Sequence, residues 1–194
     1  MLEVEVISDP VAAVTALDPI RSRLLAELTE PASAAALASR TGITRQKVNY
    51  HLRALEQRGL VLPAGERRWG GLVERLMVAS AASYVVSPGA LGAVGADPGR
   101  SSDRLSASYL IALSARAVRE VGEMWRSARE TNKRLATLSI DTAIRFRSPG
   151  DRARFTEELS TAVTELVATY HDETAAGGRT HRLVLAAYPM PPGN

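Results

Sequence analysis

The sequence contains no cysteine and no long apolar run. Without cysteine, disulfide bonds, catalysis by a thiol and metal sites built on thiolates are excluded. No stretch approaches the roughly 20 apolar residues that a membrane-spanning helix requires. The first ten residues, MLEVEVISDP, are acidic where a secretory signal is basic. We therefore expect a cytoplasmic protein that has no membrane partner.

The signatures of common enzyme classes are also missing. The sequence has no HExxH, no GxSxG, no phosphate-binding Walker loop and no dinucleotide-binding fingerprint. His171, Asp172 and Glu173 are possible metal ligands, but adjacent residues on a helix point in different directions. We expect a protein that is not an enzyme and that has no cofactor and no metal site.

A large excess of charge of either sign is absent too, since the net charge is only +3 over 194 residues. The distribution is more informative. Residues 18–84 contain ten Lys/Arg and six Asp/Glu, a net +4, whereas residues 1–17 contain three acidic residues and no basic one. The basic excess fits a polyanionic partner for residues 18–84 without requiring one.

The most informative stretch is residues 41–60, TGITRQKVNYHLRALEQRGL. Gly42 tolerates a positive φ in a turn, and Thr44 is a suitable cap for a helix that starts at Arg45. Val48, Leu52 and Leu55 form an apolar stripe, and the remaining surface is polar. Its side chains suit base edges and phosphates in a major groove. We interpret this as a DNA recognition helix with Thr44, Arg45, Gln46, Lys47, Asn49, Tyr50 and Arg53 as its DNA contacts.

Two helices are predicted before it. Asp18 and Pro19 provide a cap and a first-turn proline for a helix that extends to about Thr29. Ser33 caps a short helix over residues 34–40, whose small residues permit a close crossing with the recognition helix. Residues 1–9 alternate weakly and indicate a short strand or an arm.

A β-hairpin is predicted after the recognition helix. Gly59 suits a helix C-terminus, residues 60–62 and 72–79 are extended runs, and Gly70-Gly71 is a hairpin dipeptide. We place Arg67, Arg68 and Trp69 at its tip, where they would contact phosphate or the minor groove. A helix-turn-helix followed at once by such a hairpin is a winged helix.

The order and spacing of these segments resemble a known family. ALDPIRSRLLAEL, LASRTGITRQKVNYHLRALEQRGLV and ERRWGGLVERLMVASAASYVVSP are similar to the winged-helix domain of ArsR-type bacterial transcriptional regulators, over roughly residues 15–87. The resemblance implies a DNA-binding inducible repressor, with His51 on the inner side of the recognition helix as a packing residue. Metal-sensing members place cysteines in or near this helix, or Asp and His pairs on a C-terminal helix, and this sequence has no cysteine.

A Gly-, Pro- and Ala-rich linker at residues 87–101 precedes a long helix that we predict to about Asn132. Its apolar surface is wider than one neighbour requires, which favours a homodimer over an internal core helix. The predicted dimer contacts are Leu110, Leu113, Ala117, Val121 and Met124. Tyr109 and Trp125 are candidates for a ligand pocket, although aromatic residues at helical spacing are more often packing residues.

The last segment is predicted to form a strand, a helix and a strand. Residues 138–147 alternate between apolar and polar, residues 148–151 cap a helix that continues to about Tyr170, and residues 181–188 form a second strand. Residues 189–194 are a tail. This module is a candidate for effector binding, for part of the dimer interface, or for both.

The sequence therefore predicts an α+β fold that is mainly α. Its parts are a winged helix-turn-helix at 1–86, a linker at 87–101, a dimerisation and possible effector domain at 102–188, and a tail at 189–194. We expect a homodimeric, sequence-specific regulator, a repressor, that binds a palindromic operator in double-stranded DNA and responds to a small-molecule effector. The alternatives are a winged-helix protein-interaction module and a small-molecule-binding protein with a DNA-binding appendage.

Overall fold

The polypeptide divides into two units, Met1–Leu135 and Ala136–Asn194. The structure is a computed structural model that describes residues 1–69 and 72–191, without the side chains of Trp69 and Leu72. The predicted long helix lies in the first unit, together with the winged helix. The domain boundaries inferred from the sequence stay predictions.

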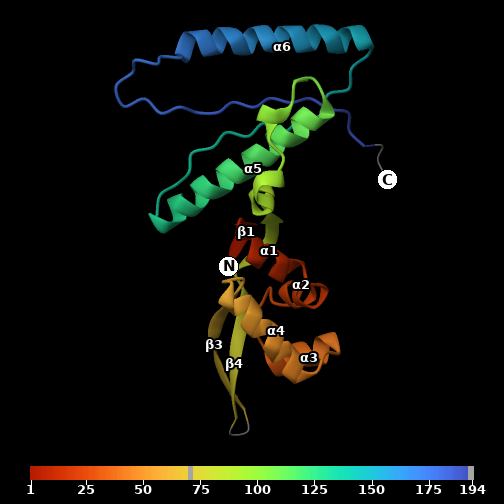
Figure 1. Cartoon of the computed structure of the whole chain (residues 1–194), viewed down its shortest axis with the longest axis vertical. Helices are drawn as coiled ribbons and strands as arrows, with labels where there is room; N and C mark the ends of the chain where they lie inside the picture. Colours follow the sequence, from red (N-terminus) through yellow and green to blue (C-terminus); the bar gives the residue numbers. More distant parts are fainter. Residues whose placement is uncertain (70–71, 192–194) are drawn as a thin grey trace. The chain divides into compact units, whose positions relative to one another are not determined.

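Four short helices lie in the first half of the first unit, which we call unit 1 (Figure 1). Each starts at a side chain that accepts hydrogen bonds from free backbone N–H groups: Asp9, Asp18, Ser33 and Thr44. The last three caps confirm the sequence prediction, whereas the first helix was not predicted. The helices are α1 (Pro10–Leu17), α2 (Pro19–Ala26), α3 (Ala34–Thr41) and α4 (Arg45–Gln57).

The predicted wing is confirmed as an antiparallel hairpin of β3 (Val61–Trp69) and β4 (Leu72–Ala79). A two-residue strand β2 (Ala32–Ser33) pairs with the other edge of β4, which gives the order β2-β4-β3. The prediction that residues 63–69 form a loop between the two extended runs is wrong. A bulge between Pro63 and Glu66 absorbs one extra residue, so pairing resumes and continues along β3. The predicted Gly70-Gly71 turn lies outside the described residues.

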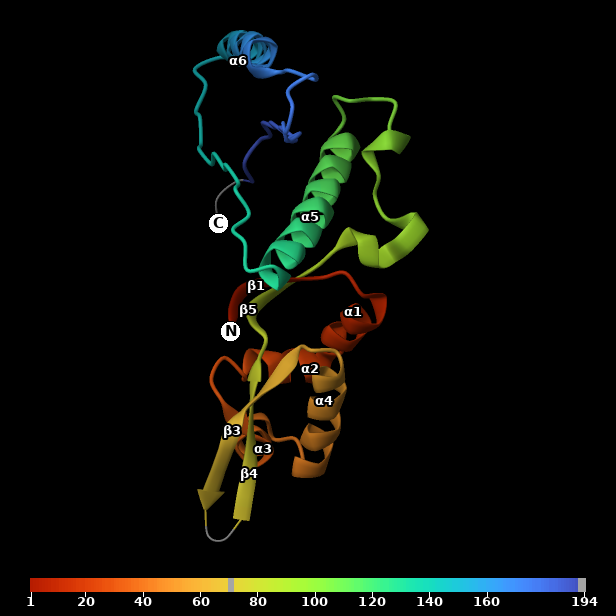
Figure 2. The ribbon, with the colours of Figure 1, turned by 90° about the vertical axis from the view of Figure 1, so that its left-hand side faces the viewer.

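The core of unit 1 lies between α2–α4 and this sheet. Leu24, Leu28, Leu37, Val48, Leu55, Leu60 and Val61 are its largest fully buried apolar side chains. They come from all three helices and from the start of β3, so burial of one cluster fixes the helices against the hairpin. In Figure 2, α4 and the hairpin lie at the same end of unit 1, with α3 between them in this view.

A second, parallel sheet joins the start of the chain to the end of the wing. The expected N-terminal strand is present as β1 (Leu2–Ile7), which pairs with β5 (Ala81–Val86). The predicted linker contains two 3₁₀ helices, η1 (Pro88–Val94) and η2 (Pro98–Arg100). The long helix α5 (Ala107–Glu130) follows, and it begins four to five residues later than the predicted start at Ser102 or Asp103. Gly122 of α5 lies so close to β1 that an added Cβ would be 2.8 Å from Val6 Cγ1.

The second unit, unit 2, contains the helix α6 (Pro149–Tyr170), which confirms the predicted helix. The predicted strands at 138–147 and 181–188 are wrong, because both segments are extended but belong to no sheet. A segment of alternating apolar and polar residues forms a strand only when a neighbouring strand supplies hydrogen bonds and one face becomes buried. Here the apolar side chains of both segments are largely exposed.

Candidate nucleic-acid interface

The local sequence around α4 fixes the direction of this helix. Gly42 ends α3 with a φ of 71°, a left-handed conformation that favours glycine. Thr44 then caps α4, and its Oγ1 accepts a hydrogen bond from the Lys47 N–H at 3.4 Å. Val48, Leu52 and Leu55 are buried on the inner side. With this inner stripe fixed, the positions on the opposite side of α4 are exposed.

The predicted DNA contacts of α4 share this outer surface. All seven side chains are exposed: Thr44, Arg45, Gln46, Lys47, Asn49, Tyr50 and Arg53. Within residues 1–69 and 72–191, the side chains of Arg45, Gln46, Lys47, Asn49 and Arg53 form no intramolecular hydrogen bond or ion pair. Their donors are therefore available to an external partner, and no rearrangement of the protein is needed to release them.

His51 lies on the inner side of α4, as the family resemblance implies. It is 8% exposed, and the ring of Tyr50 contacts it edge-on, with ring centroids 5.2 Å apart. This burial fits a packing residue. The contact also orients Tyr50, whose side chain is 65% exposed, toward solvent.

The two arginines of the wing have different environments. Arg67 Nη2 donates to Glu74 Oε2 at 3.2 Å across the hairpin, so its charge is partly neutralised. Arg68 is exposed on β3 opposite Val73, and no partner is found for it among the described residues. Both lie in the strand and not in a loop. The side chain of Trp69, also predicted to contact DNA, lies outside the described part of the chain.

An ion pair that the sequence did not reveal connects the wing to α4. Arg75 of β4 donates from Nη1 and Nη2 to the two carboxylate oxygens of Glu56, at 2.9 and 2.5 Å. This hydrogen-bonded carboxylate raises the pKa of the Arg75 guanidinium. The two residues are 19 positions apart, so no local spacing rule points to the pair. It connects the last turn of α4 to β4 of the hairpin.

Comparison with known families agrees with this geometry. A family model described as a helix-turn-helix domain matches the part of the chain that contains α2, α3 and α4. Residues 16–63 are a helix-turn-helix domain. This domain is ArsR-like, which confirms the resemblance inferred from the sequence, and a further C-terminal region follows it. Against curated proteins, the chain has no significant match.

The helix-turn-helix domain is a DNA-binding fold, in which the second helix of the motif enters the major groove. In this chain that helix is α4, since α3 and α4 are joined by the turn at Gly42. The protein thus carries a DNA-binding domain of the kind found in transcriptional regulators. In the described residues, no helix is long and apolar enough to cross a membrane.

The helix α5 has two faces of different character. Ala112, Ala115 and Gly122 are buried on one face. At about 100° per residue, the predicted dimer contacts fall on the opposite face: Leu110, Leu113, Ala117, Val121 and Met124. Of these, Val121 and Met124 are 43% and 48% exposed, and the other three are half-buried.

A cavity of about 320 Å³ lies beside Trp125 in unit 1. The residues that line it are Glu5, Val6, Gly122, Trp125, Arg126, Arg129 and Glu130. The Arg129 guanidinium lies 5.9 Å from the centre of the Trp125 ring system, and Arg126 donates to Ser8 Oγ at 3.0 Å. Tyr109, the other candidate pocket residue, does not line this cavity.

Proposed function

We propose that this protein is a homodimeric transcriptional repressor that binds an inverted-repeat operator through α4 and the wing. One α4 from each protomer enters successive major grooves, and Arg68 contacts the adjacent backbone. A two-fold dimer matches a two-fold DNA sequence, so each half-site is bound by the same residues. This sequence specificity, the dimer, the repressor activity and a cytoplasmic location go beyond what the helix-turn-helix domain alone establishes.

The exposed surface of α4 is the observation that carries this proposal. Arginine can donate to two acceptors of guanine, and asparagine can pair with adenine N6 and N7. Arg45 and Asn49 lie one helical turn apart on the outer side of α4, exposed and without intramolecular partners among the described residues. Exposed donors at this spacing suit the base edges of a major groove.

The base-contacting role of Asn49 can be tested by comparing specific and random DNA. We expect Asn49→Ala to reduce affinity for the operator by about 1–3 kcal/mol, with little change for random duplex. The matched control is Gln57→Ala, which removes an exposed side-chain amide from the last residue of α4. An equal loss of affinity on both DNAs would contradict a base contact.

The dimer is supported by the exposed apolar face of α5. A helix that buries one face in its own unit and leaves Val121 and Met124 on the other has a surface for a second copy. The helix α1 also leaves Val11, Val14 and Leu17 at least half exposed. We expect Val121→Glu to weaken the dimer in sedimentation experiments. Val94→Glu, at an 80% exposed valine of η1, is the matched control and should not.

A second candidate function is effector sensing at the cavity beside Trp125. An indole ring next to two guanidinium groups suits an aromatic carboxylate. Glu5 lines this cavity and also accepts a hydrogen bond from Ser80 Oγ at 2.5 Å. Since Ser80 N–H donates to the carbonyl of Leu60, just after α4, a ligand that moves Glu5 would affect the DNA-binding domain. A change in tryptophan fluorescence on titration with benzoate, absent in Arg129→Ala, tests this function.

The salt dependence of binding to duplex DNA distinguishes a DNA-binding protein from a protein-interaction module. DNA binding releases counterions, so affinity for random duplex should fall steeply as salt rises. No binding to duplex at low salt would favour a docking module for an acidic protein.

A further inference from the structure

The helix α6 has an apolar stripe that nothing in unit 2 buries. Phe155, Leu159, Val163, Leu166 and Tyr170 recur at intervals of four, four, three and four residues, the spacing of one helix face. No residue of α6 is buried. Leu159, Leu166 and Tyr170 are 38%, 58% and 81% exposed, although Phe155 contacts Phe146 with ring centroids 5.3 Å apart. Such a stripe is normally covered by a partner.

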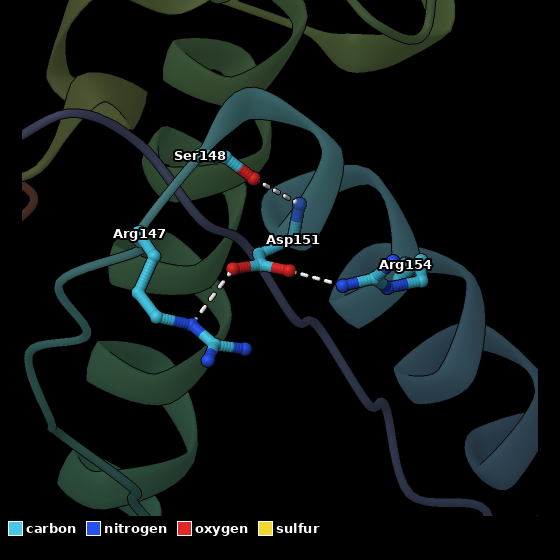
Figure 3. Close-up of polar contacts among 4 residues, drawn as sticks. All are labelled: Arg147, Ser148, Asp151 and Arg154. Atoms are coloured by element: carbon cyan, nitrogen blue, oxygen red, sulfur yellow. Dashed lines mark hydrogen bonds and ion pairs between the residues drawn. The ribbon is translucent and has the colours of Figure 1, made fainter.

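The charges around this stripe are separated along the helix. Residues 142–156 contain four arginines and one aspartate, a net +3, whereas residues 157–173 contain five acidic residues and no Lys or Arg, a net −5. Asp151 is already paired with Arg147 and Arg154 at the start of the helix, where Ser148 caps it (Figure 3). Hydrogen bonds from Thr174 lower the pKa of Asp172, which keeps the other end anionic.

This charge order is unfavourable for an isolated helix. The helix dipole favours anions at the N-terminus and cations at the C-terminus, and the free charges of α6 are arranged the other way round. A second α6 that runs antiparallel places opposite charges together, because its acidic end lies beside the basic end of the first helix. A parallel neighbour would place like charges together. The charge pattern therefore complements itself in the antiparallel direction only.

We propose that α6 binds α6 of a second copy of this chain in an antiparallel pair. The apolar stripe specifies the register, in which paired positions sum to 325. Phe155 then lies opposite Tyr170, Leu159 opposite Leu166, and the small Ala162 opposite Val163 at the centre. Arg152 lies on the same face near the start of α6, and Glu173 lies three residues beyond its end at Tyr170, so in this register Arg152 of one copy is near Glu173 of the other. The Glu173 side chain is 84% exposed, and its Oε1 lies 3.4 Å from His171 Nε2 of the same chain.

The two extended segments of unit 2 extend the interface. The 22 residues of α6 make a helix about 33 Å long and about 10 Å wide. Its footprint, on the order of 300 Å², is well below the roughly 800 Å² per partner of a stable interface. Residues 138–147 and 181–188 flank α6 in the sequence and contain exposed apolar side chains, Leu138, Ile140, Leu183 and Leu185 among them. The pairing of the helices thus brings further apolar surface into the interface.

The absence of cysteine makes a clean cross-linking test possible in the full chain. In the proposed pair, helices about 8 Å apart bring the two Cα atoms of residue 162 within the roughly 4.4–6.8 Å that a disulfide spans. Ala168 is a matched control, since it is also an exposed alanine of α6 but lies on the opposite face. We expect Ala162→Cys to form a disulfide-linked dimer under mild oxidation and Ala168→Cys to remain monomeric on a non-reducing gel.

A charge exchange tests the direction of the pair. In the Ala162→Cys background, Arg152→Glu and Glu173→Arg should each slow cross-linking, because each places like charges opposite each other. The double variant Arg152→Glu/Glu173→Arg should restore the rate. Rescue cannot result from a folding defect, since the double variant carries both substitutions.

Several cross-linking results would overturn the proposed α6 pair. If the chain's own extended segments cover the stripe, Ala162→Cys will fail to cross-link, and the proposal is overturned. Equal cross-linking of the two cysteine variants, or no rescue by the charge exchange, overturns it as well. The experiment contains no DNA and no change in α5, so its result is independent of the proposed DNA-binding function.

Discussion

The Tyr84 hydroxyl group connects β5 to Leu60, three residues after the end of α4. It donates to the Leu60 carbonyl at 3.0 Å, accepts from the Ala81 N–H at 3.2 Å and lies 3.0 Å from Ser80 Oγ. Tyr84→Phe removes all three contacts with little change in shape. The consequence for stability depends on which groups have another partner.

Two of the three groups keep a partner in the variant. The Leu60 carbonyl still accepts from the Ser80 N–H at 2.9 Å, and Ser80 Oγ still donates to Glu5. The Ala81 N–H, in a residue that is 2% exposed, loses the Tyr84 oxygen that it donates to. A buried donor left without a partner costs about 1–3 kcal/mol, so we expect a loss of about 2 kcal/mol in the free energy of unfolding of unit 1.

Urea unfolding measures this loss. Both tryptophans, Trp69 and Trp125, lie in unit 1, so their fluorescence reports on its unfolding alone. With a slope of about 2 kcal/mol/M, the midpoint should fall by about 1 M in Tyr84→Phe. The control is Tyr188→Phe, a 70% exposed tyrosine of unit 2, which should leave the midpoint unchanged. Equal midpoints for wild type and Tyr84→Phe would refute the reasoning.

Two further predictions concern single charges. Arg68→Ala should reduce the slope of log affinity for DNA against log salt by about 0.9, and Arg67→Ala should reduce it less, because Glu74 already pairs with Arg67. Equal slopes for the two variants would contradict this. For Asp18, hydrogen bonds from the backbone N–H groups of the first turn of α2, chiefly that of Arg21, lower the carboxyl pKa below 3.8. The stabilisation from its charge is therefore present above about pH 4 and is lost as the pH falls through the lower, folded-state pKa. Asp18→Asn, which keeps the cap, should be less stable by about 0.3–1 kcal/mol at pH 7 by urea unfolding, and this difference should shrink as the pH falls through the folded-state pKa. A pH-independent difference would show that the charge is not responsible.

Local signals in the sequence were sufficient to predict α2, α3 and α4. Each begins at a capping residue, and α4 follows a glycine at a left-handed position. The same signal precedes α1, where Asp9 and Pro10 repeat the Asp18 and Pro19 pattern, so that helix was available from the sequence and was missed. Caps and turns depend on a few neighbouring residues, which explains why they can be predicted.

The remaining features depend on contacts between distant residues. Arg75 and Glu56 form an ion pair, and Glu5 and Ser80 are joined across 75 positions, but nothing near either residue in the sequence indicates its partner. In unit 2 the sequence instead predicted strands that the structure does not contain. The alternation of Leu138, Ile140 and Ile144 predicted a strand, yet pairing requires a neighbour that the sequence pattern cannot supply.

Selection of bound sequences from a random DNA library tests the central claim most directly. The account predicts enrichment of an inverted repeat whose half-sites lie about one helical turn, roughly 10 base pairs, apart. It also predicts that Asn49→Ala loses the preference at one position of each half-site and that the control Gln57→Ala keeps it. Enrichment of no motif, or of a single unrepeated half-site, would contradict the proposal of a dimer that recognises its operator through α4.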